Sequence, residues 1–199
     1  MTRLRFVLGL MYLLLAALLF RQAGSLSPAI AKTTDEPTSC SSASLPQDLQ
    51  SRLKADYSTW KIQQAQTLSE HARKTWEGKK PLACPGVAVG LFQGAKTRSY
   101  AVLLVPAGHP DAGYRFLVFS RKDGQSYEAA VVEQSDDKGA SNYFIRSVPV
   151  SRFFGEASKK KFQVQAAEAI LMVDSAEQEY EADLYFWSNG RFQQHPVDE

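Results

Sequence analysis

The sequence predicts an α+β fold in which two N-terminal helices pack on a twisted antiparallel sheet of about six or seven strands. Apolar residues first recur every three to four positions, which is typical of amphipathic helices. After Gly86 they recur every second position, in segments rich in β-branched and aromatic residues. Short turn signals separate these segments, so consecutive strands should pair as an antiparallel meander.

Two segments carry the helical signals. The second follows the capping-box pattern Thr67–Glu70 and ends at Gly78. Both segments are polar on their outer faces, so each helix should cover a face of the sheet. The first spans 45–57, and its apolar residues recur every four positions: Leu45, Leu49, Leu53 and Tyr57.

The strands are predicted from alternation and from the turns between them. Asp123-Gly124 and Asn189-Gly190 tolerate positive φ and therefore favour hairpin turns. Two polar segments, 134–141 and 155–161, are expected to be loops. The expected strands are Val87–Phe92, Ser99–Val105, Tyr114–Ser120, Tyr127–Glu133, Tyr143–Val148, Ile170–Val173 and Glu179–Trp187.

The N-terminus has the pattern of an export signal. Arg3 and Arg5 precede a nearly unbroken apolar run, and small residues follow it near Ala31. Residues 1–31 are thus expected to be a signal peptide, with an uncleaved membrane anchor as the alternative. Residues 32–44 read as a flexible linker, and 45–199 as a single α+β domain.

Charge and cysteine content narrow the function classes. Residues 1–31 hold three of the 23 basic residues and no acids, which leaves 20 basic against 21 acidic residues in the rest. This near-neutral balance does not favour nucleic acid as a partner.

Cys40 and Cys84 are an even pair in an exported chain, so we expect a disulfide, with two free thiols as the alternative. Such a bridge closes a loop of about 45 residues and stabilises the fold by ~4 kcal/mol in the chain-entropy model.

Residues 91–102, LFQGAKTRSYAV, resemble the core of FG-GAP (integrin α-type) repeats, which also occurs in small exported bacterial proteins of unknown function. The matching residues are the structural ones: Gly90, Phe92, Gly94, Tyr100, Ala101 and Val102. The resemblance implies a β-rich scaffold, and the single visible copy does not imply a propeller. Where such repeats carry acidic calcium ligands, this chain has Leu91, Gln93, Ala95 and Ser99. Calcium binding is therefore expected to be lost, and no metal or other cofactor is predicted.

Two surfaces are candidates for binding. In the last predicted strand, alternation places one acidic and aromatic set on a single face: Glu179, Glu181, Asp183, Tyr185 and Trp187. This face could recognise a basic partner or a sugar, and the alternative is an ordinary solvated face with Tyr185 and Trp187 half covered by a helix. Lys96 and Arg98 could form a basic rim, or could simply be solvated.

No catalytic motif is present around the histidines His71, His109 and His195. We therefore expect an exported, non-enzymatic protein of the cell envelope or the medium, acting by binding or structure on a protein or glycan. Membrane contact is expected only through an uncleaved N-terminal segment. The alternatives are a small secreted hydrolase with dispersed catalytic residues, such as His109 with Asp111, and a signal-anchored periplasmic factor.

Overall fold

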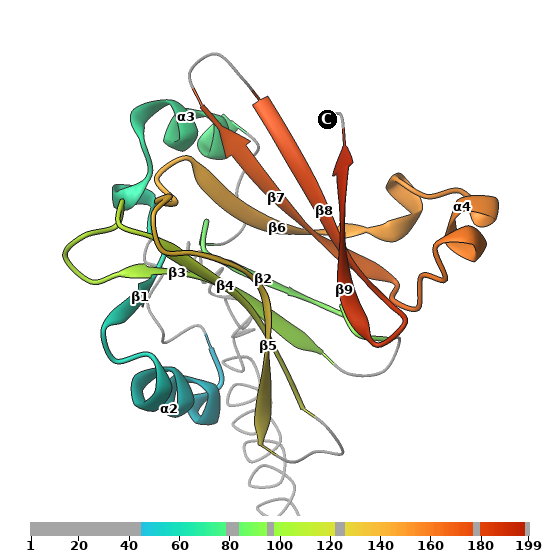
Figure 1. Cartoon of the computed structure of the whole chain (residues 1–199), viewed down its shortest axis with the longest axis horizontal. Helices are drawn as coiled ribbons and strands as arrows, with labels where there is room; N and C mark the ends of the chain where they lie inside the picture. Colours follow the sequence, from blue (N-terminus) through green and yellow to red (C-terminus); the bar gives the residue numbers. More distant parts are fainter. Residues whose placement is uncertain (1–44, 79–83, 95–97, 122–125, 177–179, 198–199) are drawn as a thin grey trace, which may run out of the picture. The chain divides into compact units, whose positions relative to one another are not determined.

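Nine strands form two antiparallel sheets in the computed structural model, which describes residues 45–78, 84–94, 98–121, 126–176 and 180–197 (Figure 1). The described residues all belong to one compact unit. The predicted signal peptide 1–31, the linker 32–44 and Cys40 within it lie outside the described residues. The predicted turn Asp123-Gly124 lies outside them too.

The first sheet has the strand order β1-β3-β4-β5, and β2 pairs with β3 on the same side as β1. Consecutive strands of the second sheet pair in the order β6-β7-β8-β9. Antiparallel pairing of neighbouring strands is thus confirmed, but the prediction of one sheet of six or seven strands is wrong. The strands of the first sheet are β1 Trp60–Ile62, β2 Val87–Gly90, β3 Ser99–Pro106, β4 Tyr114–Arg121 and β5 Tyr127–Ser135. Those of the second are β6 Tyr143–Pro149, β7 Glu168–Ser175, β8 Tyr180–Ser188 and β9 Arg191–Val197.

The two sheets face each other across a shared core. Side chains from both sheets meet in one buried cluster that includes Phe116, Ile145 and Tyr185. The backbone N–H of Ile145 in β6 also donates to the carbonyl of Pro85, just before β2, at 2.8 Å. Two sheets form because the central strands β3 and β7 are apolar on both faces, and a single sheet covered only by two helices would leave part of that surface exposed.

The helices cover the outer faces of the sheets. Helix α2 (Gln47–Asp56) packs Leu49 and Leu53 on the outer face of the first sheet. Helix α3 (Glu70–Gly78) lies against the second sheet, where Trp76 contacts its outer core. The prediction that both N-terminal helices pack on one sheet is therefore wrong, because the segment between them, which contains strand β1 and the 3-10 helix Ala65–Thr67, leads from the first sheet to the second.

Several local features differ from the prediction at their ends. Thr67 belongs to the 3-10 helix Ala65–Thr67, and Ser69 caps α3 by accepting from the N–H of Ala72 at 3.2 Å. The predicted loop 155–161 contains helix α4 (Glu156–Lys161), which follows the 3-10 helix Val150–Arg152. None of the helices in the described ranges has the length and apolar character that a membrane crossing requires.

The C-terminal hairpin confirms one turn prediction. Asn189 and Gly190 have φ values of 52° and 77°, the left-handed geometry that a two-residue hairpin turn needs. The turn adds strand β9, which the alternation did not predict. His195 pairs with Leu184 in this strand, so the polar segment up to Val197 belongs to the sheet.

Candidate functional site

A cavity of about 510 Å³ opens between the two sheets, and we call it the inter-sheet pocket. It is lined from β4, β5 and the segment after it in one layer, and from β6, β7, β8 and β9 in the other. Its charged side chains are five carboxylates and one ammonium group: Glu133, Asp137, Asp174, Glu181, Asp183 and Lys138.

A β-bulge places Glu133 in this pocket. Along β5, Val131 pairs with Leu117 and Glu133 pairs with Phe116, so Val132 is one extra residue between the two pairs. Regular alternation would put Glu133 on the same face as Val131, the outer face. The bulge instead turns the carboxylate to the inner face, where Phe116 packs.

Two tyrosine hydroxyls hold the Glu133 carboxylate. Tyr114 from the first sheet donates to Oε1, and Tyr185 from the second sheet donates to Oε2. Burial raises the pKa of both tyrosines, and the hydrogen bonds to the Glu133 carboxylate and its negative charge raise them further. Both phenols therefore stay protonated at neutral pH and fix one negative charge between the sheets.

Like charges face each other on the second sheet. Asp174 in β7 is directly opposite Glu181 in β8, an arrangement that costs stability unless a cation lies nearby. Lys138 Nζ is 3.5 Å from Asp174 Oδ2, but Asp174 Oδ1 is buried and has no hydrogen-bond partner among the described residues. A ligand that donates a hydrogen bond could therefore satisfy Asp174 Oδ1.

The residues predicted for a binding face separate in the structure. Glu181 and Asp183 line the inter-sheet pocket, and neither forms an ion pair within the described residues. Tyr185 is buried under the other sheet with Phe116, so its ring is not offered to solvent. Trp187 packs edge-on against Phe192 at a centroid distance of 5.1 Å. Glu179 lies outside the described residues.

Sequence reasoning missed the other half of this site. Glu133, Asp174 and Lys138 come from three different segments, and no short-range pattern joins them. The one available signal was an acid, Asp174, directly after the apolar run of β7, which reads EAILMVDS. The bulge that turns Glu133 inward had no signal in the alternation of β5.

Two of the four residues at the calcium-ligand positions of the FG-GAP-like loop, Leu91 and Gln93, form hydrogen bonds within the protein. The N–H of Leu91 donates to Glu168 at 2.8 Å, and Gln93 accepts from the hydroxyl of Ser120. Ser99 is fully buried, Arg98 is exposed, and Ala95 and Lys96 lie outside the described residues. Within the described ranges, no group of three or more His, Cys, Asp or Glu side chains is placed to hold a metal ion.

The glycines of this loop have structural reasons. A side chain at Gly90 would meet the ring of Phe92 at 2.6 Å and the hydroxyl of Ser147 at 2.9 Å. Gly94 has a φ of 140°, a conformation that favours glycine. Cys84 Sγ lies 3.3 Å from the carbonyl oxygen of Gln63. The Cys40–Cys84 disulfide stays a prediction, because Cys40 is not described.

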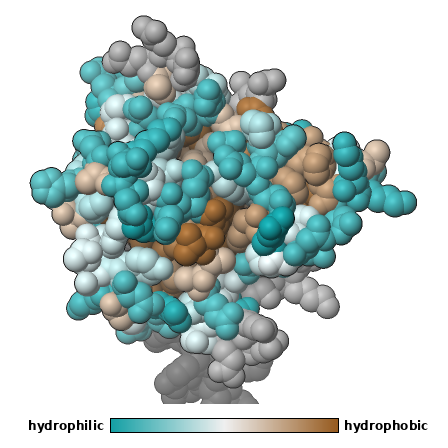
Figure 2. Space-filling model, viewed as in Figure 1, coloured by the Kyte–Doolittle hydropathy of each residue, from teal (hydrophilic) through white to brown (hydrophobic). Residues whose placement is uncertain are grey.

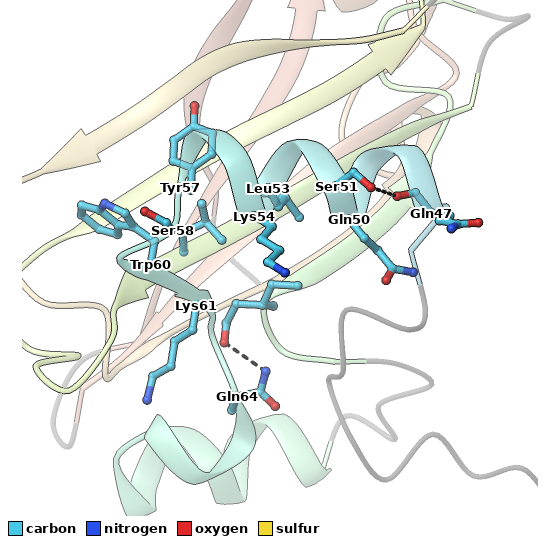
Figure 3. Close-up of a pocket in the computed structure, with 12 residues that line it drawn as sticks. Gln47, Gln50, Ser51, Leu53, Lys54, Tyr57, Ser58, Trp60, Lys61 and Gln64 are labelled. Carbon is cyan, nitrogen blue, oxygen red and sulfur yellow. Dashed lines mark hydrogen bonds between the residues drawn. The ribbon is translucent and has the colours of Figure 1, made fainter.

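A second cavity, of about 710 Å³, lies between α2 and β1, and we call it the α2–β1 groove. Figure 3 shows Gln47 and Gln50 at one end, Tyr57 and Trp60 at the other, and Lys54 extending from α2 towards the side of β1. It lies against the outer face of the first sheet, with Leu104 of β3 in its lining. None of the predicted site residues belongs to it.

The surface near these sites is mainly hydrophilic. On the face in Figure 2, the strongest hydrophobic colour gathers in a small central patch, with a paler area beside it and scattered residues elsewhere. The large apolar side chains that are exposed in the described part of the chain are Val89, Val131 and Tyr180. They come from three different strands, so this surface favours polar recognition over broad apolar docking.

The histidines do not contribute to either cavity. His71 on α3 and His109 in the turn after β3 are exposed, and Asp111 is exposed as well. His195 packs against the rings of Phe154 and Phe162, each at a centroid distance of 5.6 Å.

Comparisons with protein-family models, with curated proteins and with solved structures found no match for this chain.

Proposed function

We propose that this chain is an exported, non-enzymatic binding protein that takes a cationic group of its partner into the inter-sheet pocket. The observation that carries the proposal is the imbalance of charge in that pocket, where five carboxylates meet a single lysine. A concave site lined mainly by one sign of charge focuses the field and raises the local concentration of ions of opposite sign.

The details of the pocket favour an ammonium or guanidinium group. Both are hydrogen-bond donors only, which suits the unpartnered Oδ1 of Asp174. A bound cation would also relieve the repulsion between Asp174 and Glu181. The pocket's carboxylates do not form a metal-binding group, and this favours an organic cation with several spaced donors over a bare metal ion.

We infer that the partner is a protein with an exposed basic segment. The pocket is large enough for a long side chain, and its rim includes the exposed Glu181 and Asp137. A lysine or arginine side chain can place its charge near Glu133 while its stem lies along Met172. Residues 1–31 support a location in the cell envelope or outside the cell, because they have the pattern of an export signal.

The test is binding of tetralysine to the full chain by titration calorimetry, with the fully N-acetylated peptide as the uncharged control. We expect tetralysine to bind and the acetylated peptide not to bind. Asp183→Asn and Glu181→Gln should each weaken binding about tenfold, because a charge-assisted hydrogen bond contributes roughly 1.5–3 kcal/mol. Glu128→Gln, an exposed acid of β5 outside the pocket, is the matched control and should leave binding unchanged.

Binding that Glu128→Gln weakens as much as Asp183→Asn does would contradict a specific pocket. The non-enzymatic part fails if a broad panel of hydrolase substrates shows turnover that His109→Ala abolishes. Mass spectrometry of the exported protein distinguishes a cleaved signal, with an N-terminus near Lys32, from a signal-anchored factor with an intact N-terminus.

A further inference from the structure

We propose that the α2–β1 groove is a second ligand site and that it binds an acidic glycan, a sugar chain that carries carboxylates. This inference is independent of the cationic partner proposed for the inter-sheet pocket. The groove has an apolar floor of three buried side chains, Leu53, Ile62 and Leu104. Polar and aromatic side chains of α2 and β1 stand around that floor (Figure 3).

The charge of the groove selects an anion. Among the described residues that line it, Lys54 and Lys61 are the charged ones, and none is a carboxylate. Neither lysine forms an ion pair within the described part of the chain. Arg52, a half-buried cation of the same helix, instead pairs with Asp56 at 3.0 Å. Two unpaired ammonium groups around one cavity attract a ligand with carboxylates.

The neutral polar groups of the groove suit a sugar. Three amides and three hydroxyls line it: Gln47, Gln50, Gln64, Ser51, Tyr57 and Ser58. The Gln50 amide and the Ser51 hydroxyl already donate to the carbonyls of Leu45 and Gln47, at 2.6 and 2.9 Å, and their oxygens can still accept from a ligand. Sugar hydroxyls also donate and accept hydrogen bonds. They therefore suit amide side chains better than ligand carboxylates or phosphates do, because ionised carboxylates and phosphates mainly accept. A ligand recognised by charge alone would not need this set.

Trp60 offers a rigid aromatic surface at one end of the groove. The guanidinium of Arg115 lies over its ring, 4.6 Å from the centroid. Arg115 is itself held by the carbonyl oxygens of Tyr114 and Ser135, each at 2.9 Å. An aromatic ring fixed in this way loses little conformational freedom on binding, and the C–H groups of a sugar can pack on the negative face of such a ring.

An acidic peptide fits the groove less well than a glycan. Peptides often bind an exposed strand edge by adding a strand, and β1 is such an edge. However, β1 has only three residues, and the carbonyl of Ile62 already accepts from the Gln64 amide at 3.0 Å. A blunted, short edge leaves few backbone groups for a peptide to pair with.

The test is titration of the full chain with an oligosaccharide of galacturonic acid, in low and in physiological salt. We expect binding that weakens as salt rises. The double variant Lys54→Gln, Lys61→Gln should lose at least tenfold in affinity, and Trp60→Ala should also lose at least tenfold. Trp60→Phe, which keeps an aromatic ring, should lose less, and it guards against loss of binding through misfolding of Trp60→Ala.

The controls separate this site from charge effects and from the other pocket. Lys160→Gln, an exposed lysine of α4, should bind the acidic oligosaccharide normally, as should Asp183→Asn in the inter-sheet pocket. An oligosaccharide of glucose should not bind. The proposal is overturned if the acidic sugar does not bind, if the lysine variants bind it normally, or if polyaspartate or polyphosphate binds as tightly and without dependence on Trp60.

Discussion

The inter-sheet pocket and the α2–β1 groove lie on opposite faces of the first sheet and carry opposite charge. The inter-sheet pocket is built where two layers meet, so buried groups such as Tyr114 and Tyr185 hold its charges in place. The groove is built on the outside, and its lysines are exposed. The first sheet thus keeps the carboxylates of the pocket apart from the lysines of the groove. On a single surface these charges would neutralise each other. Changes in the pocket should alter stability, whereas changes at the groove rim should not.

The largest effect on stability should come from Glu133→Ala. This change leaves the buried hydroxyls of Tyr114 and Tyr185 without their acceptor, and we expect the free energy of unfolding to fall by about 2 kcal/mol. Urea denaturation of the full chain measures the loss. Adding Tyr114→Phe and Tyr185→Phe to Glu133→Ala should recover much of it, because no donor is then left unpaired. No recovery would mean that packing, not hydrogen bonding, sets the cost.

Stability should next depend on alkaline pH. The pKa values of Tyr114 and Tyr185 are raised in the folded state by burial and by Glu133, whereas tyrosines of the unfolded chain titrate near pH 10. Below that pH both states hold the proton, so stability is unaffected. Above it the unfolded state loses protons first, and the free energy of unfolding should fall by at most about 1.4 kcal/mol per pH unit for each tyrosine. Denaturation at several pH values, compared with the double phenylalanine variant, tests this dependence.

Glu181→Gln should act in the opposite direction. Removing one of the two like charges that face each other at Asp174 and Glu181 should raise the free energy of unfolding by about 0.5 kcal/mol. The same change should weaken tetralysine binding, so the Glu181 carboxylate lowers the stability of the fold while it strengthens binding of the cation. Thermal unfolding in low salt measures the gain, which should shrink as salt screens the pair. A loss of stability would show that Glu181 has a structural role.

The smallest effect on stability should come from the groove. Lys54→Gln together with Lys61→Gln should change the free energy of unfolding by less than about 0.5 kcal/mol, because both side chains are exposed and without ion pairs in the described residues. The same denaturation measurement provides the comparison with Glu133→Ala. A large loss would remove the contrast between a pocket that supports the fold and a groove that does not.

The face of β8 was predictable from alternation. Ala182, Leu184 and Phe186 lie together in the outer core, and Tyr185 lies in the core between the sheets. Alternation within one strand needs only the geometry of the backbone, so it can be read from neighbouring residues. Nothing in that pattern states which layer covers each face. The acidic face was expected at the surface or under a helix, and it lies partly under the other sheet.

By itself the sequence determined the antiparallel pairing of neighbouring strands, the turn at Asn189-Gly190 and the two sides of β8, because these depend on residues close together in the chain. Only the tertiary structure decided that the strands form two sheets and that α2 and α3 cover different ones. It also brought Glu133 to Asp174 and Asp183, through a bulge of one residue and contacts between distant strands. Those contacts depend on which layer covers each apolar face. Residues far apart in the chain decide this, so no pattern within one segment predicts it.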